Sequence, residues 1–345
     1  MVEEFYFDLA LKEAWLSQGI TLPNPCVGAV ITDERGAILS IQSHKEAGKP
    51  HAEVLALRDA FAKINGDLGI LALQDAQEIH NFLLQNAQNT FRNCELYITL
   101  EPCIHEGQTP SCAKLLSILK PKKIFIGTKD PNEKACGGTK MLEDCGIPII
   151  KAWEEGSLKA IHQACKNLLL PFTILHQKQK FLLYKYASRL DGSLEGGQIT
   201  QKLAQSFMHN IRSKVDFLLI SGKTIRKDNP RLDCRFATLE NPKSPDILVL
   251  TRQNELPKDF LVFTIPNRKV QIIREISSLK GFVMIEGGNN LFQNLYHHID
   301  LLLVFLNPSL REDFHQRMQL NANFKVLFST LVGEDLLLWL LPLRD

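Results

Sequence analysis

The sequence lacks any long apolar segment. The longest apolar runs of the 345 residues, such as 301–306, fall far short of the roughly 20 residues that a membrane-spanning helix needs. It also lacks an excess of charge, because 40 lysines and arginines stand against 38 aspartates and glutamates, so nothing indicates a polyanionic partner such as nucleic acid. The first residues, Met1-Val2-Glu3-Glu4, are acidic and lack the apolar region of a secretory signal. We therefore expect neither membrane insertion nor export.

Cysteine is too sparse for a disulfide scaffold. Eight cysteines in 345 residues are well below the density of disulfide-rich domains. Without an export signal we expect a cytoplasmic location, where thiols stay reduced. Cysteines at useful spacings then indicate metal ligands or catalytic groups rather than bridges. The hydrophobic fraction of 45 % is ordinary for a globular protein, and at about 150 residues per domain the length predicts two domains.

The order of predicted elements divides the chain into two α/β domains. Residues 1–150 alternate helices and strands, as is typical of a three-layer α/β domain. Its helices are predicted over 5–18, 51–62, 76–84, 111–119 and near 140, and its strands over 26–31, 95–100, 124–127 and 147–150. The second domain, residues 151–345, opens with a connecting helix within 151–175 that Pro171 ends. Its strands are predicted over 181–186, 217–220, 247–250, 282–285 and 301–306.

Three short segments of the first domain carry residue types that commonly serve as zinc ligands. They are Pro50-His51-Ala52-Glu53, Glu101-Pro102-Cys103 and Thr109-Pro110-Ser111-Cys112. His51, Cys103 and Cys112 suit a tetrahedral Zn²⁺ whose fourth position stays open for water. Such an ion lowers the pKa of its water to about 7. Glu53 is suited to take that proton and return it to a leaving amine, which makes it the predicted catalytic residue.

Local structure sets how these residues can meet. His51 and Glu53 lie roughly 200° apart around a helix, so they converge only on an ion beyond the helix N-terminus, toward which Cβ atoms lean. Thr109-Pro110 predicts an N-cap followed by proline at the first helical position. Cys112 then falls in the first turn, where the helix dipole favours a thiolate.

Two other interpretations of the cysteine and histidine pattern stay open. A structural zinc site normally has four protein ligands, and the neighbouring His105 is the chemical candidate for a fourth. The remaining cysteines are expected to be packing residues. They are Cys26, Cys94, Cys136, Cys145, Cys165 and Cys234.

The first domain resembles the zinc-dependent cytidine deaminase superfamily, whose signature is H-x-E followed by P-C-x-x-C. Here eight residues separate the two cysteines instead of two, which looks like the variant found in bifunctional riboflavin-biosynthesis deaminase/reductases. The segments Pro23-Asn24-Pro25-Cys26-Val27-Gly28 and Asp130-Pro131-Asn132 agree with that family. The resemblance implies deamination of 2,5-diamino-6-ribosylamino-4(3H)-pyrimidinone 5′-phosphate, with Asn24 helping to hold the pyrimidine.

The second domain resembles the reductase half of the same family. Residues 282–285, the turn Glu286-Gly287-Gly288 and the segment from Asn289 predict a strand, a glycine turn and a helix, an arrangement that can approach a phosphate. The segments 185–192 and 224–235 carry the resemblance, which implies a dihydrofolate-reductase-like fold and reduction by NADPH of a ribosyl to a ribityl group. By position it implies NADPH contacts from Ala187, Thr224, Asp228, Gly288, Asn289, Asn290, Leu291, Phe292, Gln293 and Asn294, and sugar-phosphate contacts from Arg212, Leu232, Arg235 and Glu286.

The reductase half departs from the family at two positions. Gln198 stands where the family usually has Trp, and Arg189 where it usually has Ser. An alternative hypothesis is therefore a deaminase whose second domain binds a ligand without reducing it. A zinc-stabilised RNA-binding module is the alternative from another class, but the weak charge, the lack of a basic-aromatic stripe and the presence of Glu53 disfavour it.

Residues 63–92 form a polar segment that looks longer than the corresponding connection in the family. A solvated surface extension and a subunit contact both explain it. The sequence leaves a homo-oligomer open and does not decide between NADPH and NADH.

Overall fold

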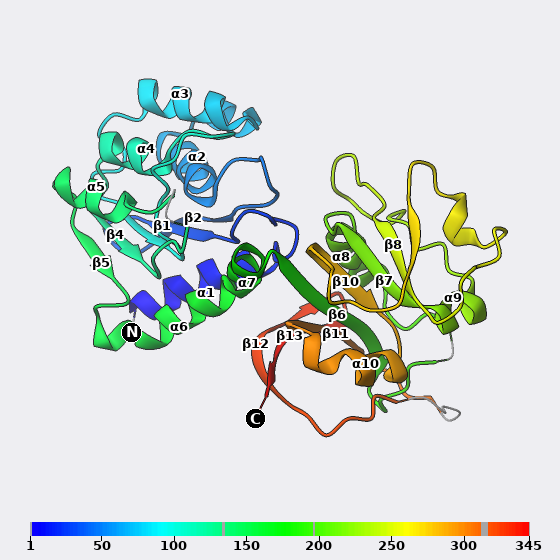
Figure 1. Ribbon diagram of the computed structural model, residues 1–345. Helices are drawn as coiled ribbons and strands as arrows, with labels where there is room; N and C mark the ends of the chain where they lie inside the picture. Colours follow the sequence, from blue (N-terminus) through cyan, green and yellow to red (C-terminus); the bar gives the residue numbers. More distant parts are fainter. Residues whose placement is uncertain (1, 133–134, 196, 312–316, 345) are drawn as a thin grey trace. The chain divides into compact units, whose positions relative to one another are not determined.

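The computed structural model describes residues 2–132, 135–195, 197–311 and 317–344. By their contacts the residues form two compact units, Met1–Thr173 and Ile174–Asp345 (Figure 1). Each unit is an α/β structure with its own sheet and its own core. Among the described residues no helix has the length and apolar character needed to cross a membrane.

The first unit is built on a five-stranded sheet of order β2-β1-β3-β4-β5. β1 pairs antiparallel with β2 and β3, whereas β3, β4 and β5 are parallel. Figure 1 shows α1 and α6 on one face and α2 on the other, so the predicted three-layer arrangement is confirmed. The elements are α1 (Val2–Trp15), β1 (Gly28–Thr32), β2 (Ile38–Ser43), α2 (Ala52–Asn65), α3 (Ala76–Asn86), β3 (Glu95–Ile98), α4 (Cys112–Leu119), β4 (Lys123–Ile126), α5 (Gly138–Asp144), β5 (Ile149–Lys151) and α6 (Lys159–Leu168).

The main core of this unit lies between the sheet and the helices α2, α3 and α4. Apolar positions of α2 at a helical period, including Leu57 and Phe61, pack against inward-facing strand residues such as Ile31 and Ile98. The helix α3, from the polar segment 63–92, adds Ile79 and Leu83 to the same core. The N-cap of α3 is Asp75, whose carboxylate accepts hydrogen bonds from backbone amides of the first turn. The helix α3 of this segment thus packs on α2, whereas residues 63–69 are exposed, and a subunit contact through the segment stays a prediction.

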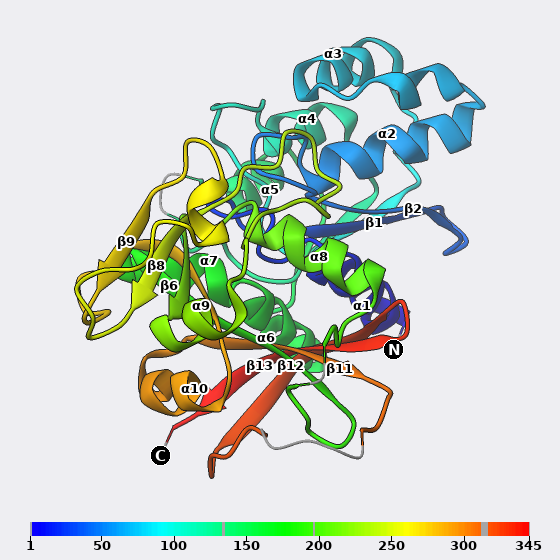
Figure 2. The ribbon, with the colours of Figure 1, turned by 90° about the vertical axis from the view of Figure 1, so that its right-hand side faces the viewer.

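The second unit contains an eight-stranded sheet of order β12-β13-β11-β6-β10-β7-β8-β9. The strands from β11 to β9 are parallel, and the hairpin β12–β13 is added antiparallel to β11 (Figure 2). The core on one face packs α10 against the sheet, and on the other face Phe207 of α8 contacts Phe305. The elements are α7 (Leu170–Lys178, which crosses the division), β6 (Lys180–Arg189), α8 (Lys202–Arg212), β7 (Phe217–Ser221), α9 (Gly222–Asp228), β8 (Asp246–Leu250), β9 (Val270–Ile273), β10 (Gly281–Glu286), α10 (Asn289–Leu295), β11 (Leu301–Asn307), β12 (Asn323–Val332) and β13 (Asp335–Leu343).

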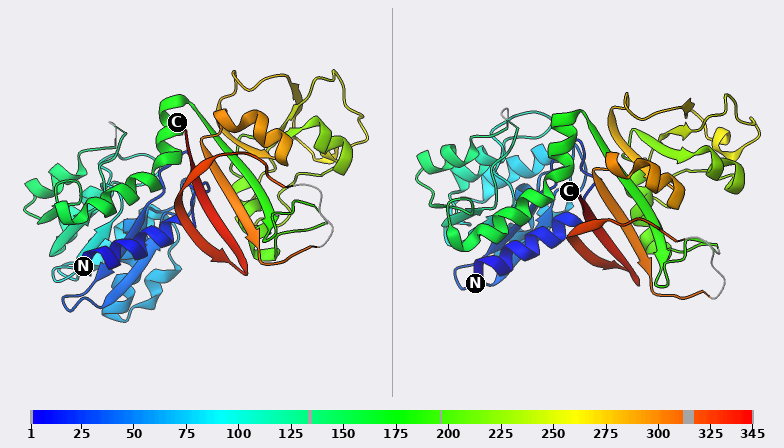
Figure 3. Two further views of the ribbon diagram at one scale, coloured as in Figure 1. Left: turned by 90° about the horizontal axis from the view of Figure 1, so that it is seen from below. Right: turned by 60° about the horizontal axis from the view of Figure 1, so that its bottom comes forward.

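Residues 151–173 group with the first unit, although the sequence analysis assigns them to the second. α6 packs beside α1 (Figure 3), and the Gln18 side chain donates a 2.6 Å hydrogen bond to the carbonyl of Leu168. The chain also stays helical beyond Pro171, because this proline lies in the first turn of α7, where its missing N–H costs nothing. The functional boundary near residue 150 stays a prediction.

Candidate active sites

Two of the predicted zinc ligands, His51 and Cys112, lie at the N-termini of the helices α2 and α4. His51 is the N-cap of α2 and its side chain makes no capping hydrogen bond, so the imidazole is available to a ligand. Cys112 is the first residue of α4, as predicted, but the N-cap is Ser111, whose hydroxyl accepts from the amide of Lys114. The expectation that Thr109 is the cap and Pro110 the first helical residue is therefore wrong. Ser111, two residues after Thr109, is the cap because its hydroxyl reaches the free amides of the first turn.

The third ligand is held by the loop after β3. The Glu101 carboxylate is buried and accepts hydrogen bonds from the amides of Gly137 and Thr139, at 3.1 and 2.9 Å. A Cβ on Gly138 would lie 1.8 Å from the carbonyl oxygen of Pro102, so only glycine permits this close approach. These contacts fix the backbone immediately before Cys103.

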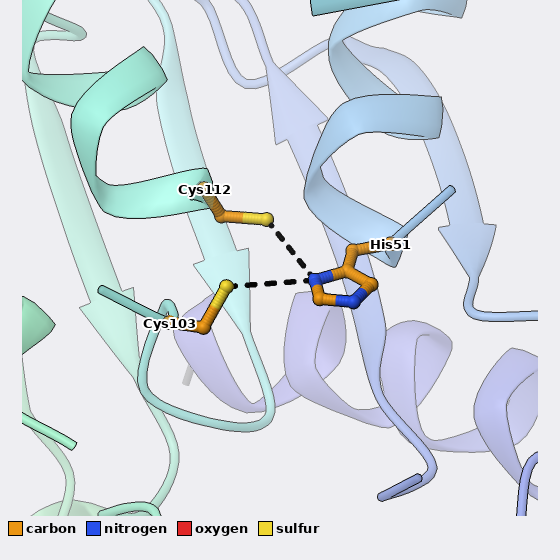
Figure 4. A group of neighbouring side chains, drawn as sticks. All are labelled: His51, Cys103 and Cys112. Carbon is orange, nitrogen blue, oxygen red and sulfur yellow. Dashed lines mark hydrogen bonds between the residues drawn. The ribbon is translucent and has the colours of Figure 1, made fainter. Parts of the chain in front are cut away.

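His51, Cys103 and Cys112 converge as the sequence predicts, with their ligand atoms all within 4.8 Å of one another (Figure 4). Nδ1 of His51 lies 3.6 Å from Sγ of Cys103 and 3.4 Å from Sγ of Cys112. Nε2 lies 3.1 Å from Oγ1 of Thr109, which can accept its proton and so leave the Nδ1 lone pair for a metal. Thr109 is thus a supporting residue that the sequence analysis assigned only to capping.

The chemistry of this donor set fits zinc. The hydrogen bond between the two thiols, together with His51, lowers the pKa of Cys103 to about 4. The same contact, together with burial, raises the pKa of Cys112 well above its ordinary value. A divalent cation would stabilise both thiolates, and one imidazole with two thiolates is a zinc ligand set with a fourth position open.

Glu53 lies beside these ligands in the first turn of α2. Its side chain is only 4 % exposed, and burial raises its pKa to about 7. The Cys112 thiol donates a hydrogen bond to the Glu53 carboxylate, which places the carboxyl group next to the metal ligands. A carboxyl that can hold or release a proton near neutral pH suits acid–base work.

Asn24 connects to the ligand cluster through His44, a residue that the sequence analysis missed. His44 Nδ1 lies 3.1 Å from the carbonyl oxygen of Pro50, which can only accept, so Nδ1 carries the proton. Its Nε2 can then accept from the Asn24 amide at 3.5 Å. The rings of His44 and His51 meet edge to face at 5.3 Å. The only signal in the sequence was a histidine at the end of a segment that forms β2.

The second unit holds a cavity of about 1010 Å³ that is lined by residues toward the carboxyl ends of the central strands β6, β7 and β10. It is large enough for a dinucleotide-sized ligand, since pockets for smaller ligands span about 300–1000 Å³. A Cβ on Gly287 would lie 2.7 Å from Leu291 Cδ2, so the glycine leaves this wall free of side chain. The predicted residues that line the cavity are Ala187, Thr224, Asp228, Leu232, Glu286, Gly288, Asn289, Asn290 and Leu291.

The structure does not bring the other predicted residues into the cavity lining. Phe292 is buried in the core, and the Gln293 side chain bonds to the carbonyl of Gln319. Asn294 is an exposed residue of α10, whose lining residues are at its start. Arg212 is buried and forms a bidentate pair with Glu286, at 2.7 and 2.9 Å from Nη2. Arg235 is half exposed and pairs with Asp233 at 3.0 Å.

The sequence analysis missed several polar residues of the lining. The clearest is Lys185, where burial lowers the pKa of the amine although the nearby Glu286 opposes this shift. Its signal was a charged residue inside a strand predicted to be buried. Ser221 also lines the cavity, and its hydroxyl caps α9 by accepting from the amide of Thr224. Lys223, Lys227 and Arg317 add positive charge to the wall.

Comparison with known proteins assigns both units. Residues 1–128 match the family described as the cytidine and deoxycytidylate deaminase zinc-binding region, and residues 180–311 match the RibD C-terminal domain. The riboflavin biosynthesis protein RibD of Aquifex aeolicus is 28 % identical over 90 % of this chain and 88 % of its own length. The RibD protein of Bacillus amyloliquefaciens is 31 % identical over 76 % of this chain and 63 % of its own length. The chain belongs to the RibD family.

Solved structures agree with that assignment. A crystal structure from Thermotoga maritima, described as a diaminohydroxyphosphoribosylaminopyrimidine deaminase/5-amino-6-(5-phosphoribosylamino)uracil reductase, has a TM-score of 0.64 at 25 % identity and covers 99 % of both chains. Acinetobacter baumannii RibD has the same fold, with a TM-score of 0.61. The chain is thus a bifunctional enzyme of riboflavin biosynthesis, with a zinc-dependent deaminase domain and a reductase domain of the NADPH-using type. The predicted fold classes are confirmed, and an inactive second domain is not favoured.

Proposed function

We propose that the first unit deaminates 2,5-diamino-6-ribosylamino-4(3H)-pyrimidinone 5′-phosphate. The second unit then reduces the ribosyl group of the product, 5-amino-6-(5-phosphoribosylamino)uracil, to ribityl. The observation that carries this proposal is the convergence of His51, Cys103 and Cys112 beside the buried Glu53 in a chain that also holds the reductase cavity. The activities named for the Thermotoga relative support the choice of substrates.

In the deaminase site, His51, Cys103 and Cys112 hold the zinc ion and Glu53 moves the proton. When bound, Zn²⁺ supplies Lewis-acid activation of a water molecule. Glu53 takes one proton as the water oxygen bonds to the amine-bearing ring carbon, and it passes this proton to the adjacent ring nitrogen. It then takes the second proton from the hydroxyl formed on that carbon and gives it to the amine. The carbon–nitrogen bond breaks, ammonia leaves and the carbonyl of the uracil ring forms. Burial keeps Glu53 away from bulk solvent, so it can transfer both protons within the site.

Asn24 holds the pyrimidine ring in this proposal. Its amide is oriented by His44, which is itself fixed by the carbonyl of Pro50 and packed against His51. This chain of contacts relates the position of the ring to that of the metal ligands. An amide offers both a donor and an acceptor, which suits the polar edge of a pyrimidine.

In the reductase site, the lining residues bind and orient NADPH and the sugar. NADPH supplies the hydride, which goes to C1′ of the ribosyl group. Lys185 and Lys223 are cationic residues of the lining that suit phosphates, whereas Lys227 is paired with the lining carboxylate of Glu195 at 3.0 Å. Arg212 acts on the substrate through Glu286, because its guanidinium is held in the pair with that carboxylate. Leu232 and Glu286 are the lining residues proposed to contact the sugar phosphate, and Arg235 stays a proposed phosphate contact outside the lining.

The remaining predictions concern the cellular location, the partners, the oligomeric state and the domain boundary. We place the enzyme in the cytoplasm, with small pyrimidine ribosyl phosphates as its partners and no nucleic acid. The net charge of +2 and the eight cysteines, none of which the structure places in a disulfide, support this placement. A homo-oligomer and a functional division near residue 150 remain proposals.

Product analysis tests the proposal. Purified protein with one Zn²⁺ per chain is supplied with the diamino substrate and NADPH, and ammonia and NADP⁺ are followed together. The proposal expects one ammonia and one NADP⁺ per substrate, with ammonia appearing first. NADP⁺ without ammonia would contradict the assigned order, and ammonia without NADP⁺ would contradict the reductase assignment.

A further inference from the structure

We propose that Arg189 is a positioning residue of the reductase cavity, whose buried guanidinium holds residues 193–195 and 197–198, here called the segment, in place as one wall. The proposal rests on the proposed function of this cavity as the NADPH site. Leu194, Glu195, Gly197 and Gln198 of the segment line the cavity. Arg189 itself does not line it and acts through the backbone that it holds.

Arg189 is almost completely buried, with 2 % of its surface exposed, at the end of β6. Its Nη1 donates to the carbonyl of Glu195 and lies 3.5 Å from the Ser193 hydroxyl. Its Nη2 donates to the carbonyl of Gln198 at 3.4 Å. One planar guanidinium therefore reaches three residues of the segment, which the five donors of arginine permit and a lysine amine does not match.

The segment is also held from outside by two further contacts. The Glu195 carboxylate pairs with Lys227 of α9 at 3.0 Å. After the segment, the amide of Gln201 donates a 2.7 Å hydrogen bond to the fully buried Asp335. The backbone around Gly197, which has a φ of +85°, has no side chain that would restrict it. Arg189 thus supplies the buried restraint between these outer contacts.

The restraint has a consequence for binding. A wall that is not fixed before the ligand arrives must be ordered on binding, and this ordering weakens affinity. The sequence departs from the family at positions 189 and 198. In one of these contacts the guanidinium of Arg189 donates to the backbone carbonyl of Gln198. Arg189 therefore favours binding of the cofactor by preorganising backbone that the cofactor meets.

The test compares Arg189→Met, which keeps the length of the side chain without its donors, with Arg189→Lys. NADPH affinity is measured by fluorescence titration of the zinc-loaded protein, and amide hydrogen exchange is measured over the segment. We expect Arg189→Met to weaken NADPH binding by about tenfold and to speed exchange of the segment. Arg189→Lys should recover part of the affinity. With the uracil substrate, KM for NADPH should rise while kcat changes less than about twofold.

Arg344→Met is the matched control. Arg344 also donates to backbone carbonyls, those of Tyr296 and Ile299, but these residues do not line the cavity. It should leave NADPH affinity unchanged. Wild-type affinity in a folded Arg189→Met protein would overturn the proposal, as would a fall in kcat at constant affinity. If Arg189→Met fails to fold, wild-type affinity and exchange in Arg189→Lys overturn it. Wild-type protein that does not bind NADPH would instead refute the proposed function of the cavity.

Discussion

The two units build their sites in different ways. The first gathers four side chains, His51, Glu53, Cys103 and Cys112, at the starts of two helices and one adjacent loop. The second spreads its site along a cavity of about 1010 Å³ that many separate segments line. The first site therefore depends on a few atoms at fixed distances, and single substitutions should abolish it. The second site depends on many lining residues, so most single substitutions there should weaken ligand binding partially rather than abolish it.

The largest expected effect is that of Cys103→Ser. A hydroxyl is a poor zinc ligand compared with a thiolate, so this variant should lose its bound zinc and all measurable deamination. NADPH binding by the second unit should stay at the wild-type level. Metal analysis and ammonia release measure the first effect, and a fluorescence titration measures the second. Cys145→Ser, which changes an exposed thiol away from the site, is the control. Deamination that survives in Cys103→Ser would refute the ligand assignment.

The next largest effect is that of Glu53→Gln. The amide keeps the size of the side chain but cannot carry the proton, and general acid–base catalysis contributes about 10²–10⁴-fold. We expect deamination to fall by about 10³-fold while zinc content stays at one per chain. Glu78→Gln, which changes an exposed glutamate of α3, should leave the rate unaltered. A loss of zinc in Glu53→Gln would show that the carboxylate holds the metal site together rather than moving a proton.

A smaller effect is expected in the second unit for Glu286→Gln. This substitution leaves the buried Arg212 without its bidentate partner, and breaking such a pair costs about 3 kcal/mol or more. The free energy of unfolding of the second unit should fall accordingly in a urea titration, whereas deamination should not change. An unfolding midpoint equal to the wild-type value would show that the pair adds no stability.

The pH dependence of the same transition provides the control. Burial opposes the charge of Glu286, but Arg212 and Lys185 together hold its folded-state pKa below the ordinary 4.5. The stabilisation is therefore present above pH 4.5 and is lost as the pH falls through the folded-state value. The wild-type second unit should become less stable in this acidic range, and Glu286→Gln should lack this component of the loss.

The smallest effect is expected for Asn24→Ala. One hydrogen bond to a buried partner is worth about 1–3 kcal/mol, so the kcat/KM of deamination should fall about tenfold. Zinc content should be unaffected, because Asn24 reaches the ligands only through His44. Steady-state kinetics with the diamino substrate measures the change. An effect as large as that of Glu53→Gln would place Asn24 in the chemical step itself.

The same contrast explains how much the sequence could predict. The zinc site follows from residue types and spacing, because few arrangements of one histidine, two cysteines and a glutamate have another use. Glu286 and Ala187 line the cavity, and their predicted roles, like the sugar-phosphate contact predicted for Arg212, stay predictions. What the sequence did not indicate is that the Arg212 side chain is paired with Glu286. Arg212 and Glu286 are 74 positions apart in the chain and lie on α8 and β10. No local sequence pattern indicates that these two residues pair.

The sequence also predicted the helices and strands only where their apolar residues follow a clear local period. Elements with a clear period, such as α2 and β11, were predicted to within a few residues. The hairpin β12–β13 was missed because neither strand shows a period-2 alternation in its sequence. β12 lies at the sheet edge with an irregular pattern of burial, and β13 is apolar at nearly every position. His44 was missed because its role comes from the fold that places it between Asn24 and His51.

The central claim is that each unit performs its own reaction in a fixed order. It is tested most directly by NADPH oxidation in Glu53→Gln, measured separately with the diamino substrate and with the deaminated uracil substrate. We predict oxidation of NADPH at the wild-type rate with the uracil substrate and none above background with the diamino substrate. Oxidation with both substrates, or with neither, would contradict the account.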